Sequence, residues 1–544
     1  MSTNDNFSES QEKILERFVT NTTSNVFVLR NLPEVIKGAL FSRYSRSTLG
    51  LRSLLLKEFI LNEEVAFAAA AGSGDASSQD QIIAIQKAQS FYDRILDGYG
   101  DDSIGELGGA HLALEGVSML AAKVVEDCRI GGSPLEKSTR YIYFDQKIED
   151  RYLYYREPIL MTSAYRDLYI KTCDMLFETY SKLIPPLTAL FEQQLPKDPS
   201  LSKGAYTASL RAKVLDCLRG LLPAASLTNM GVFGNGRFFE SLLQKMNCSS
   251  LAEMQETGKL AYQELSKVIP SFIRRGDPLH PHYQRYAKFT EAMNGELKHL
   301  SKVYREQEIK MPQPGVRLVS FDAEGPAKVA AALLFANGHG GLQELQNFCR
   351  SLPEEDLSRI LDTACNARDN RRHKSPRGLE HAFFTFEILA DFGIYRDLQR
   401  HRMLTQERQM LTCNFGYYVP QEIIGTELHQ DYCAALNQAK EAYDIIAKEL
   451  PEEAQYVVPM AYNIHWYFHC NLRGLQWLCE LRSSPQGHPA YRLVAQEMAR
   501  QTSEAVPQFE RFFKFVDFEG YELGRLGSEI RTEEKRQQRL DVSS

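Results

Sequence analysis

The stretch EHAFFTFEILADFGIYRDLQRHR, residues 380–402, decides the fold of its part of the chain. Apolar residues occupy every second position from Ala382 to Ile388, and this alternation predicts a half-buried strand. Apolar spacing over residues 394–398 then predicts a short helix, which places Arg396 and Arg400 on one face. The stretch ends in the cationic triplet 400–402. Such a cluster favours an anionic ligand, either a phosphate or the reduced, deprotonated ring of a flavin.

The composition of the chain is that of an ordinary globular protein. Its 544 residues exceed what one typical core supports, which predicts two or more domains. The net charge of −7 gives no reason to expect binding to nucleic acid or to an anionic membrane. The apolar stretch at 65–71 is too short to span a bilayer, and the polar N-terminus lacks a signal-peptide core, so we expect a cytoplasmic protein. The ten cysteines form no CxxC pair, which favours free thiols over metal sites or disulfides.

Changes in composition along the chain predict two globular units separated by a linker. Proline-rich and glycine-rich segments surround a charged helical stretch between the two units, and this region is the best linker candidate. The tail is charged and is expected to be frayed or disordered. The predicted segments are a polar N-terminal arm at 1–24, a first unit at 25–275, a linker at 276–315, a second unit at 316–518 and a charged tail at 519–544.

The two predicted units share an internal spacing. Pro223 is followed by Asn235 and Arg237, at plus 12 and plus 14, and the second unit repeats these offsets from Pro459 with Asn471 and Arg473. Upstream, an acidic residue opens an apolar stretch in each unit, and a helix then ends in an arginine. We interpret this common order as a diverged tandem duplication.

A polar segment in the first unit is a second candidate for ligand binding. Ser118 is a candidate cap for a helix that runs to about Cys128, and two glycines then break that helix. Residues 133–140 follow and carry hydroxyls, a glutamate and an arginine, which together could hold a phosphate and a sugar hydroxyl. The aromatic residues at 141–144 then resume a strand-like pattern. The alternative for this segment is an ordinary solvated turn.

These motifs resemble those of the flavin-dependent thymidylate synthase family, ThyX. The signature of that family is R-H-R followed by E-x-S-x-R-Y, preceded by an E-H pair that opens a strand. The second unit keeps E-H at 380–381 and R-H-R at 400–402 but has lost the rest. The first unit keeps L-E-K-S-T-R-Y at 135–141 and has lost R-H-R. The family's A-R-x-x-L-P element survives around Arg219 in the first unit only, and its later arginine matches Arg482 in the second unit only.

The resemblance implies one composite site whose two halves come from the two units. The implied reaction is the reductive methylation of dUMP to dTMP, with methylenetetrahydrofolate as carbon donor and NADPH reducing FAD. It also implies an α+β chain of two similar units in tandem, with mixed helices and a small antiparallel sheet in each. The chain is then expected to form a homodimer that mimics the family tetramer. The implied substrate-binding residues are Glu136, Ser138, Arg140, Arg219 and Arg482, the implied cofactor-binding residues are His381, Arg400, His401, Arg402, Asn471 and Arg473, and the implied catalytic residues are Arg482 and Arg400.

Other interpretations remain open. The duplicated chain could be a non-catalytic protein that binds a nucleotide or a flavin, because each copy of the signature is incomplete. It could also modify a different pyrimidine nucleotide, because Asp397 stands where the family has a glutamine. A metal site is a weaker alternative: His465 and His469 would share one helix face, but no third ligand is evident, and buried histidines with satisfied hydrogen bonds fit better. We therefore predict no metal.

Overall fold

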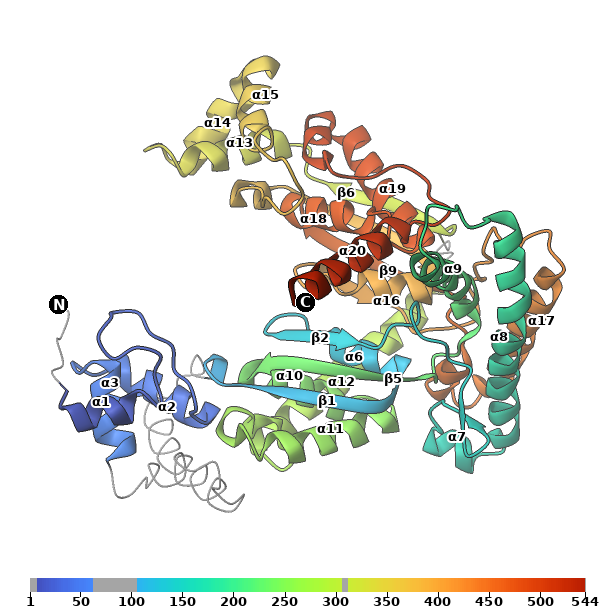
Figure 1. The fold of residues 1–544 in the computed structure, drawn as a ribbon, viewed down its shortest axis with the longest axis horizontal. Coiled ribbons are helices and arrows are strands. Elements are labelled where there is room, and N and C mark those ends of the chain that lie inside the picture. The colour runs from blue at the N-terminus through green and yellow to red at the C-terminus, as the bar shows by residue number, and fades with distance from the viewer. Residues whose placement is uncertain (1–6, 62–104, 306–311, 544) are drawn as a thin grey trace. The chain divides into compact units, whose positions relative to one another are not determined.

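The computed structural model describes residues 7–61, 105–305 and 312–543. The chain divides into two compact units, each made of separate segments (Figure 1). Unit 1 comprises 1–117, 124–136 and 229–309, and unit 2 comprises 118–123, 137–228 and 310–544. Residues 137–228, from the first half of the sequence, therefore fold together with the second half. No helix in the described residues is long and apolar enough to cross a membrane.

Unit 1 combines a three-stranded sheet, in the order β1-β5-β2, with helices. Strand β2 pairs antiparallel with β5, and Glu136 lies opposite Met230. A helix, α6 (Met119–Glu126), lies where the chain passes between the units. The other elements lying wholly or mostly in unit 1 are α1 (Glu9–Leu15), α2 (Glu34–Tyr44), α3 (Leu51–Leu54), η1 (Leu55–Ile60), β1 (Gly109–Ser118), β2 (Gly132–Glu136), β5 (Leu227–Asn235), α10 (Gly236–Asn247), α11 (Ala252–Leu265), η4 (Pro270–Phe272), η5 (Arg274–Gly276) and α12 (Pro281–Arg305).

Unit 2 is built on a four-stranded antiparallel sheet in the order β6-β7-β9-β8. Phe384, Phe386 and Ile388 of β7 are fully buried, because successive side chains of a strand point to opposite faces. The strands of this sheet are β6 (Gly315–Phe321), β7 (Phe383–Asp391), β8 (Thr405–Arg408) and β9 (Asn463–Asn471), and a separate two-stranded sheet is formed by β3 (Lys147–Ile148) and β4 (Arg151–Tyr152). The helices are α7 (Pro158–Thr162), α8 (Arg166–Gln194), α9 (Lys203–Leu218), η3 (Arg219–Leu221), α13 (Gly325–Phe335), α14 (Leu342–Ser351), α15 (Glu354–Thr363), η6 (Arg377–His381), α16 (Phe392–Leu398), α17 (Leu428–Ile446), η7 (Glu453–Val457), α18 (Leu472–Arg482), α19 (Pro489–Ala505), η8 (Pro507–Phe513) and α20 (Leu526–Ser543).

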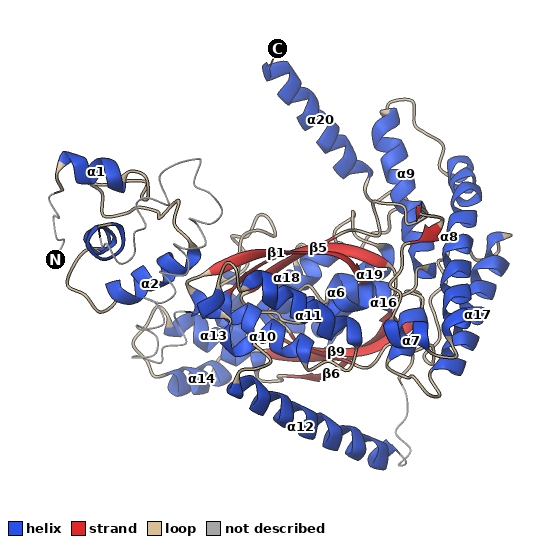
Figure 2. Cartoon of the chain, turned by 90° about the horizontal axis from the view of Figure 1, so that it is seen from below, coloured by secondary structure: helices blue, strands red, loops and turns tan. Residues whose placement is uncertain are grey.

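Helices from the two halves of the sequence pack together in unit 2. Helix α8, from the first half, lies beside α17, from the second half, in two orthogonal views (Figures 1 and 2). Lys182 of α8 donates to Asp431 of α17, with 2.6 Å between Nζ and Oδ2. The α+β class predicted from the sequence is confirmed, and the second half does not fold as a self-contained block.

Two local predictions from the opening stretch are confirmed. The alternating residues form β7, and the following helix is α16, capped by Asp391, whose Oδ1 accepts from the backbone N–H of Ile394 at 2.9 Å. The cap predicted at Ser118 is also present, since its Oγ accepts from the N–H of Ala121 at 2.9 Å.

Two local predictions are wrong. The strand after α6 is β2 at 132–136, and residues 141–144 are not a strand, because Tyr141 packs instead under the guanidinium of Arg525, 3.8 Å from the ring centre. The charged tail is neither frayed nor disordered, since α20 contacts α9 in unit 2, and its many Glu, Lys, Arg and Gln residues are good helix formers.

The predicted duplication is visible in the backbone hydrogen bonds of unit 2. Pro223 and Pro459, which occupy matching positions, form a β-bridge with each other. The N–H of Ala224 donates to the carbonyl of Val458, and the N–H of Met460 donates to the carbonyl of Leu222, both at 2.9 Å. These two bonds exchange when 236 is added to or subtracted from each residue number. Matching segments therefore meet about a local two-fold relation.

Candidate functional site

A cavity of about 510 Å³ in unit 2 collects six of the predicted site residues. It is lined by residues just before β8 and by residues of α18, which follows β9. Since the start of β8 pairs with the end of β9, one corner of the sheet supplies both groups. The six are Arg400, His401, Arg402, Asn471, Arg473 and Arg482. Most of these side chains are cationic, which suits an anionic ligand.

Two of the six are fixed by contacts with their own neighbourhood. Asn471 caps α18, and its Oδ1 accepts from the N–H of Gly474 at 2.8 Å. Arg473 donates from Nη1 to Glu380 at 2.7 Å and from Nε to the carbonyl of Ser375 at 2.8 Å. The E-H and N-x-R motifs, which are far apart in the sequence, are therefore joined by a direct ion pair.

Arg482 and His401 form the closest contact within this group. Arg482 donates from Nε to Nε2 of His401, with 2.8 Å between the nitrogens. Burial and the charge of Arg482 hold the pKa of His401 well below its ordinary value. His401 is therefore neutral, with its ring proton on Nδ1, because Nε2 serves as the acceptor.

The arginines expected at the nucleotide phosphate also lie in unit 2. Arg140 is buried and makes a two-pronged contact with Asp216, at 2.6 Å from Nε and 2.7 Å from Nη2. Arg219 is also buried, and its Nη1 lies 3.0 Å from Oδ2 of Asp397. Burial opposes ionisation of Asp397, but the nearby guanidiniums, that of Arg219 foremost, outweigh it and hold its pKa far below the ordinary value.

Tyr491 of α19 connects these arginines with the cavity. The guanidinium of Arg140 lies 5.7 Å from the centre of its ring, and that of Arg482 lies 5.5 Å from it. Arg140 also donates from Nη1 towards the Tyr491 hydroxyl at 3.4 Å. The sequence of contacts Arg140–Tyr491–Arg482–His401 therefore links residues from both halves of the chain inside one unit. Sequence reasoning missed Tyr491, because no motif contains it.

The structure does not bring all predicted residues to this cavity. Glu136 ends β2 in unit 1. Ser138 accepts from the N–H of Arg140 at 3.2 Å, within its own turn. His381 lines a separate cavity of about 940 Å³ beside α13 and α15. Arg396, predicted to share a face with Arg400, is buried instead, and its Nη1 contacts the sulfurs of Met119 and Met460.

The cavity also has a basic wall that the motifs did not indicate. Arg368, Arg371 and Lys374 line it, together with the half-exposed Trp477. Arg368 is held by Glu480 in a buried two-pronged pair, at 2.9 and 2.6 Å. The sequence signal for this wall was available in the run RDNRRHK at 368–374, a dense basic segment directly before the E-H motif.

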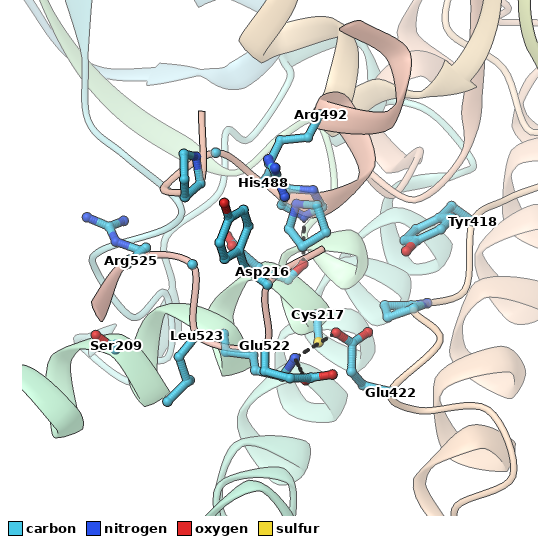
Figure 3. A pocket seen from close by; sticks show the side chains of 17 residues that line it. Ser209, Asp216, Cys217, Tyr418, Glu422, His488, Arg492, Glu522, Leu523 and Arg525 are labelled. Atoms are coloured by element: carbon cyan, nitrogen blue, oxygen red, sulfur yellow. Dashed lines mark hydrogen bonds and ion pairs between the residues drawn. The ribbon is translucent and has the colours of Figure 1, made fainter. Parts of the chain in front are cut away.

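A smaller pocket of about 50 Å³ has Asp216 and Cys217 in its lining (Figure 3). Lys213 in its wall pairs with Glu422 at 3.0 Å and with Glu522 at 3.1 Å. Burial raises the pKa of the Cys217 thiol well above its ordinary value, so this cysteine is not a thiolate nucleophile.

The weaker metal interpretation finds no support in the geometry. His465 and His469 lie on strand β9, with His465 3.0 Å from Glu387 and His469 2.9 Å from the hydroxyl of Thr385. Within the ranges that the structure describes, no group of three His, Cys, Asp or Glu side chains is placed to hold a metal ion.

Comparison with known proteins adds three findings. The chain matches the family described as "Thymidylate synthase complementing protein" over residues 56–271 and again over 318–508. It is 56% identical to a UPF0159 protein of Chlamydia muridarum (96% of this chain, 98% of the relative) and 32% identical to UPF0159 protein Ta1429 of Thermoplasma acidophilum (91% and 98%). Among solved structures, the UMP/dUMP methylase PolB from Streptomyces cacaoi is similar, at 21% identity and a TM-score of 0.29, over 38% of this chain and 98% of that one.

Proposed function

The chain belongs to the thymidylate synthase complementing protein family, as two similar units in tandem, and on this premise we propose that it is a flavin-dependent thymidylate synthase. Family membership supports a nucleotide-modifying role. The finer proposal is that the enzyme converts dUMP to dTMP, with methylenetetrahydrofolate as carbon donor, NADPH as reductant and FAD as cofactor. The observation that carries it is the link through Tyr491 between Arg140 and the cavity containing Arg482 and His401.

The residues that line the cavity around Arg400, His401 and Arg482 fit an anionic cofactor such as FAD. A volume of about 510 Å³ falls within the range of roughly 300–1,000 Å³ that is usual for ligand pockets. Arginines dominate its lining, and Trp477 offers a planar face beside them. The proposed cofactor-binding residues of this cavity are Arg400, His401, Arg402, Asn471 and Arg473. His381 is not among them, because it lines the separate cavity beside α13 and α15. When bound, FAD would supply the redox chemistry of the reaction, while the protein supplies binding and electrostatics.

Arg482 and Arg400 are the proposed catalytic residues. A guanidinium beside the uracil ring would stabilise the negative charge that develops on the ring oxygens during C5 chemistry. The neutral His401 accepts from Arg482 and so orients that guanidinium without adding a second positive charge. Ser138, Arg140 and Arg219 are proposed to hold the dUMP phosphate. Glu136 lies in unit 1 and is not assigned to this site.

We also propose that two chains form a homodimer with two active sites, the counterpart of a tetramer of single units. Analytical ultracentrifugation tests this directly, and a monomer over the whole concentration range would contradict it.

A second candidate function is the modification of a different pyrimidine nucleotide. The observation in its favour is that a carboxylate, Asp397, stands where the family has a glutamine and is ion-paired with Arg219. The two candidates differ in their substrate, so a panel of pyrimidine nucleotides separates them.

The test of function begins with the visible spectrum of the purified protein, in which a flavin is expected. NADPH oxidation should then depend on dUMP and methylenetetrahydrofolate, and tritium should leave C5 of labelled dUMP. Arg482→Gln should abolish tritium release, whereas Arg500→Gln, at an exposed pair with Glu497, should not. Protein that binds neither flavin nor dUMP would overturn the proposal, and turnover of another nucleotide alone would favour the second candidate.

A further inference from the structure

Asp397 is a common counterion for the arginines of the site. It lies on α16, its side chain is 17% exposed, and it forms an ion pair with Arg219 at 3.0 Å. Its ionisation is also favoured electrostatically by Arg140, Arg400 and Arg482, the arginines proposed for substrate binding and catalysis. A single carboxylate therefore holds a position that an anionic ligand of these arginines would also favour.

The two proposed phosphate arginines are held unequally by their carboxylates. Arg140 is bound to Asp216 through two short contacts and donates further towards Tyr491 and the carbonyl of Gln486. Arg219 meets Asp397 through one contact of 3.0 Å only. Two-pronged pairs of arginine and carboxylate are stronger and more specific than single contacts. An incoming anion would therefore displace Asp397 more readily than Asp216.

Arg219 has unused hydrogen-bonding capacity. Its Nη2 is buried and has no hydrogen-bond partner among the residues that the structure describes. Gly393 packs closely beside it, since a Cβ at that position would lie 3.2 Å from Nη2. A buried N–H group without a partner is costly, so this atom favours a ligand that can accept from it.

We propose that Asp397 is a specificity-determining residue which occupies the place of a ligand phosphate, so that a nucleotide phosphate binds Arg219 only by displacing the Asp397 carboxylate. This inference rests on the proposed function in one respect, namely that Arg219 faces the phosphate end of the substrate. The competition weakens the binding of dUMP relative to that of deoxyuridine, which carries the same base and sugar but no phosphate. The chain therefore discriminates less between nucleotide and nucleoside than a site without this carboxylate would.

Calorimetric titration of the full chain with dUMP and with deoxyuridine tests the competition. Asp397→Asn keeps the size of the side chain and removes its charge. We expect this variant to bind dUMP about tenfold more tightly than the wild type does. Its affinity for deoxyuridine should differ from that of the wild type by less than about twofold. The matched control is Asp431→Asn, which removes the same charge from the exposed pair with Lys182 and should leave both affinities unchanged. Equal changes for both ligands, or no tightening for dUMP, would overturn the proposal.

Asp397→Asn could be less stable than the wild type, since removing one partner of a buried pair is destabilising. A second measurement therefore tests the proposal through thermal stability. Inorganic phosphate should raise the Tm of Asp397→Asn more than that of the wild type, at matched ionic strength, because it fills the place left by the charge. Asp397→Glu retains the charge and should respond to phosphate like the wild type. If phosphate shifts the wild type and Asp397→Asn equally, Asp397 does not compete with phosphate.

Turnover separates this inference from the proposed function. If the wild type releases tritium from dUMP and Asp397→Asn binds dUMP no more tightly, the function stands and the inference falls. If the wild type shows no turnover while Asp397→Asn selectively gains affinity for dUMP, the inference stands and the function falls. If neither protein binds either ligand and phosphate has no effect on Tm, the inference falls.

Discussion

Arg482 donates from Nε to Nε2 of His401, with 2.8 Å between the two nitrogens, and this contact joins the last family arginine to the R-H-R triplet. The two residues are 81 positions apart in the sequence, and both line the cavity of about 510 Å³. The acceptor role of Nε2 requires a neutral imidazole, which agrees with the lowered pKa of His401. The histidine therefore acts as a fixed support for a permanently charged guanidinium.

Arg482→Lys tests this support. Lysine keeps the charge but lacks the planar donor that meets His401, so we expect kcat to fall by about 10²–10³, as when one positioned donor to a developing negative charge is lost. Tritium release from labelled dUMP measures the effect, and flavin binding should be retained. An unchanged kcat would mean that charge alone suffices at this position.

Tyr491 offers a test of the link between the two arginines. Tyr491→Phe keeps the ring and loses only a 3.4 Å contact with Arg140, so kcat/KM for dUMP should change by less than about threefold. Tyr491→Leu removes both cation–π contacts, each worth ~0.5–2 kcal/mol, and should lower kcat/KM by about tenfold or more. Steady-state kinetics with dUMP distinguishes the two variants. Equal effects would show that the ring does not position the arginines.

The pair between Arg368 and Glu480 should control stability. Its contacts of 2.9 and 2.6 Å are buried, and burial raises the pKa of Glu480 in spite of Arg368. Arg368→Met should therefore lower the free energy of unfolding by about 3–5 kcal/mol, because it leaves a buried carboxylate without its partner. Chemical denaturation measures this loss, and Arg368→Met with Glu480→Leu should recover part of it.

Lys440→Ala provides the control for that comparison. Its pair with Asp444 is similarly short, at 2.7 Å, but exposed, and exposed pairs contribute only about 0–1 kcal/mol. If Lys440→Ala lowered the free energy of unfolding as much as Arg368→Met does, the role assigned to burial would be contradicted.

Local patterns predicted local structure well. The alternation around Phe384 and Phe386 gave β7, and the hydroxyl of Ser118 gave a helix cap, because both depend on residues close in sequence. The offset of 236 between Pro223 and Pro459 predicted the duplication, and the bridge between them follows from the way the two copies pair.

Contacts between distant residues could not be predicted in this way. Arg219 and Asp397 are 178 residues apart, and no periodicity indicates that one neutralises the other. Tyr491 lies in no motif, although it contacts arginines from both halves of the chain. The error at 141–144 has a similar origin, since Tyr141, in an aromatic run typical of a strand, packs against Arg525, a residue near the other end of the sequence.

Buried neutral histidines should make stability depend on pH. Burial lowers the pKa of His488 to about 3, and burial together with Arg482 keeps that of His401 well below 6.5. Below pH 6.5 the unfolded chain therefore binds protons that the folded chain does not. The free energy of unfolding should fall as pH drops from about 6.5, by up to ~1.4 kcal/mol per pH unit for each histidine.

His488→Gln should reduce the slope of that pH dependence, whatever its effect on stability at pH 7. Denaturation between pH 7 and pH 5 measures the slope. His282→Gln, at an exposed position in unit 1, is the control and should leave the slope unchanged. A slope unaffected by His488→Gln would show that other groups carry the dependence.

Mixed assemblies test whether each site is built within one chain. Arg140 belongs to the same unit as Arg482 and Asp397, and both Arg140 and Arg482 contact Tyr491. Arg140→Ala and Arg400→Ala should each abolish conversion of dUMP. When the two inactive proteins are unfolded and refolded together, activity should not return, because every chain still carries one defect in its own site. If each site were shared between chains, mixed dimers would contain one intact site, and recovered tritium release after co-refolding would then contradict the single-chain site.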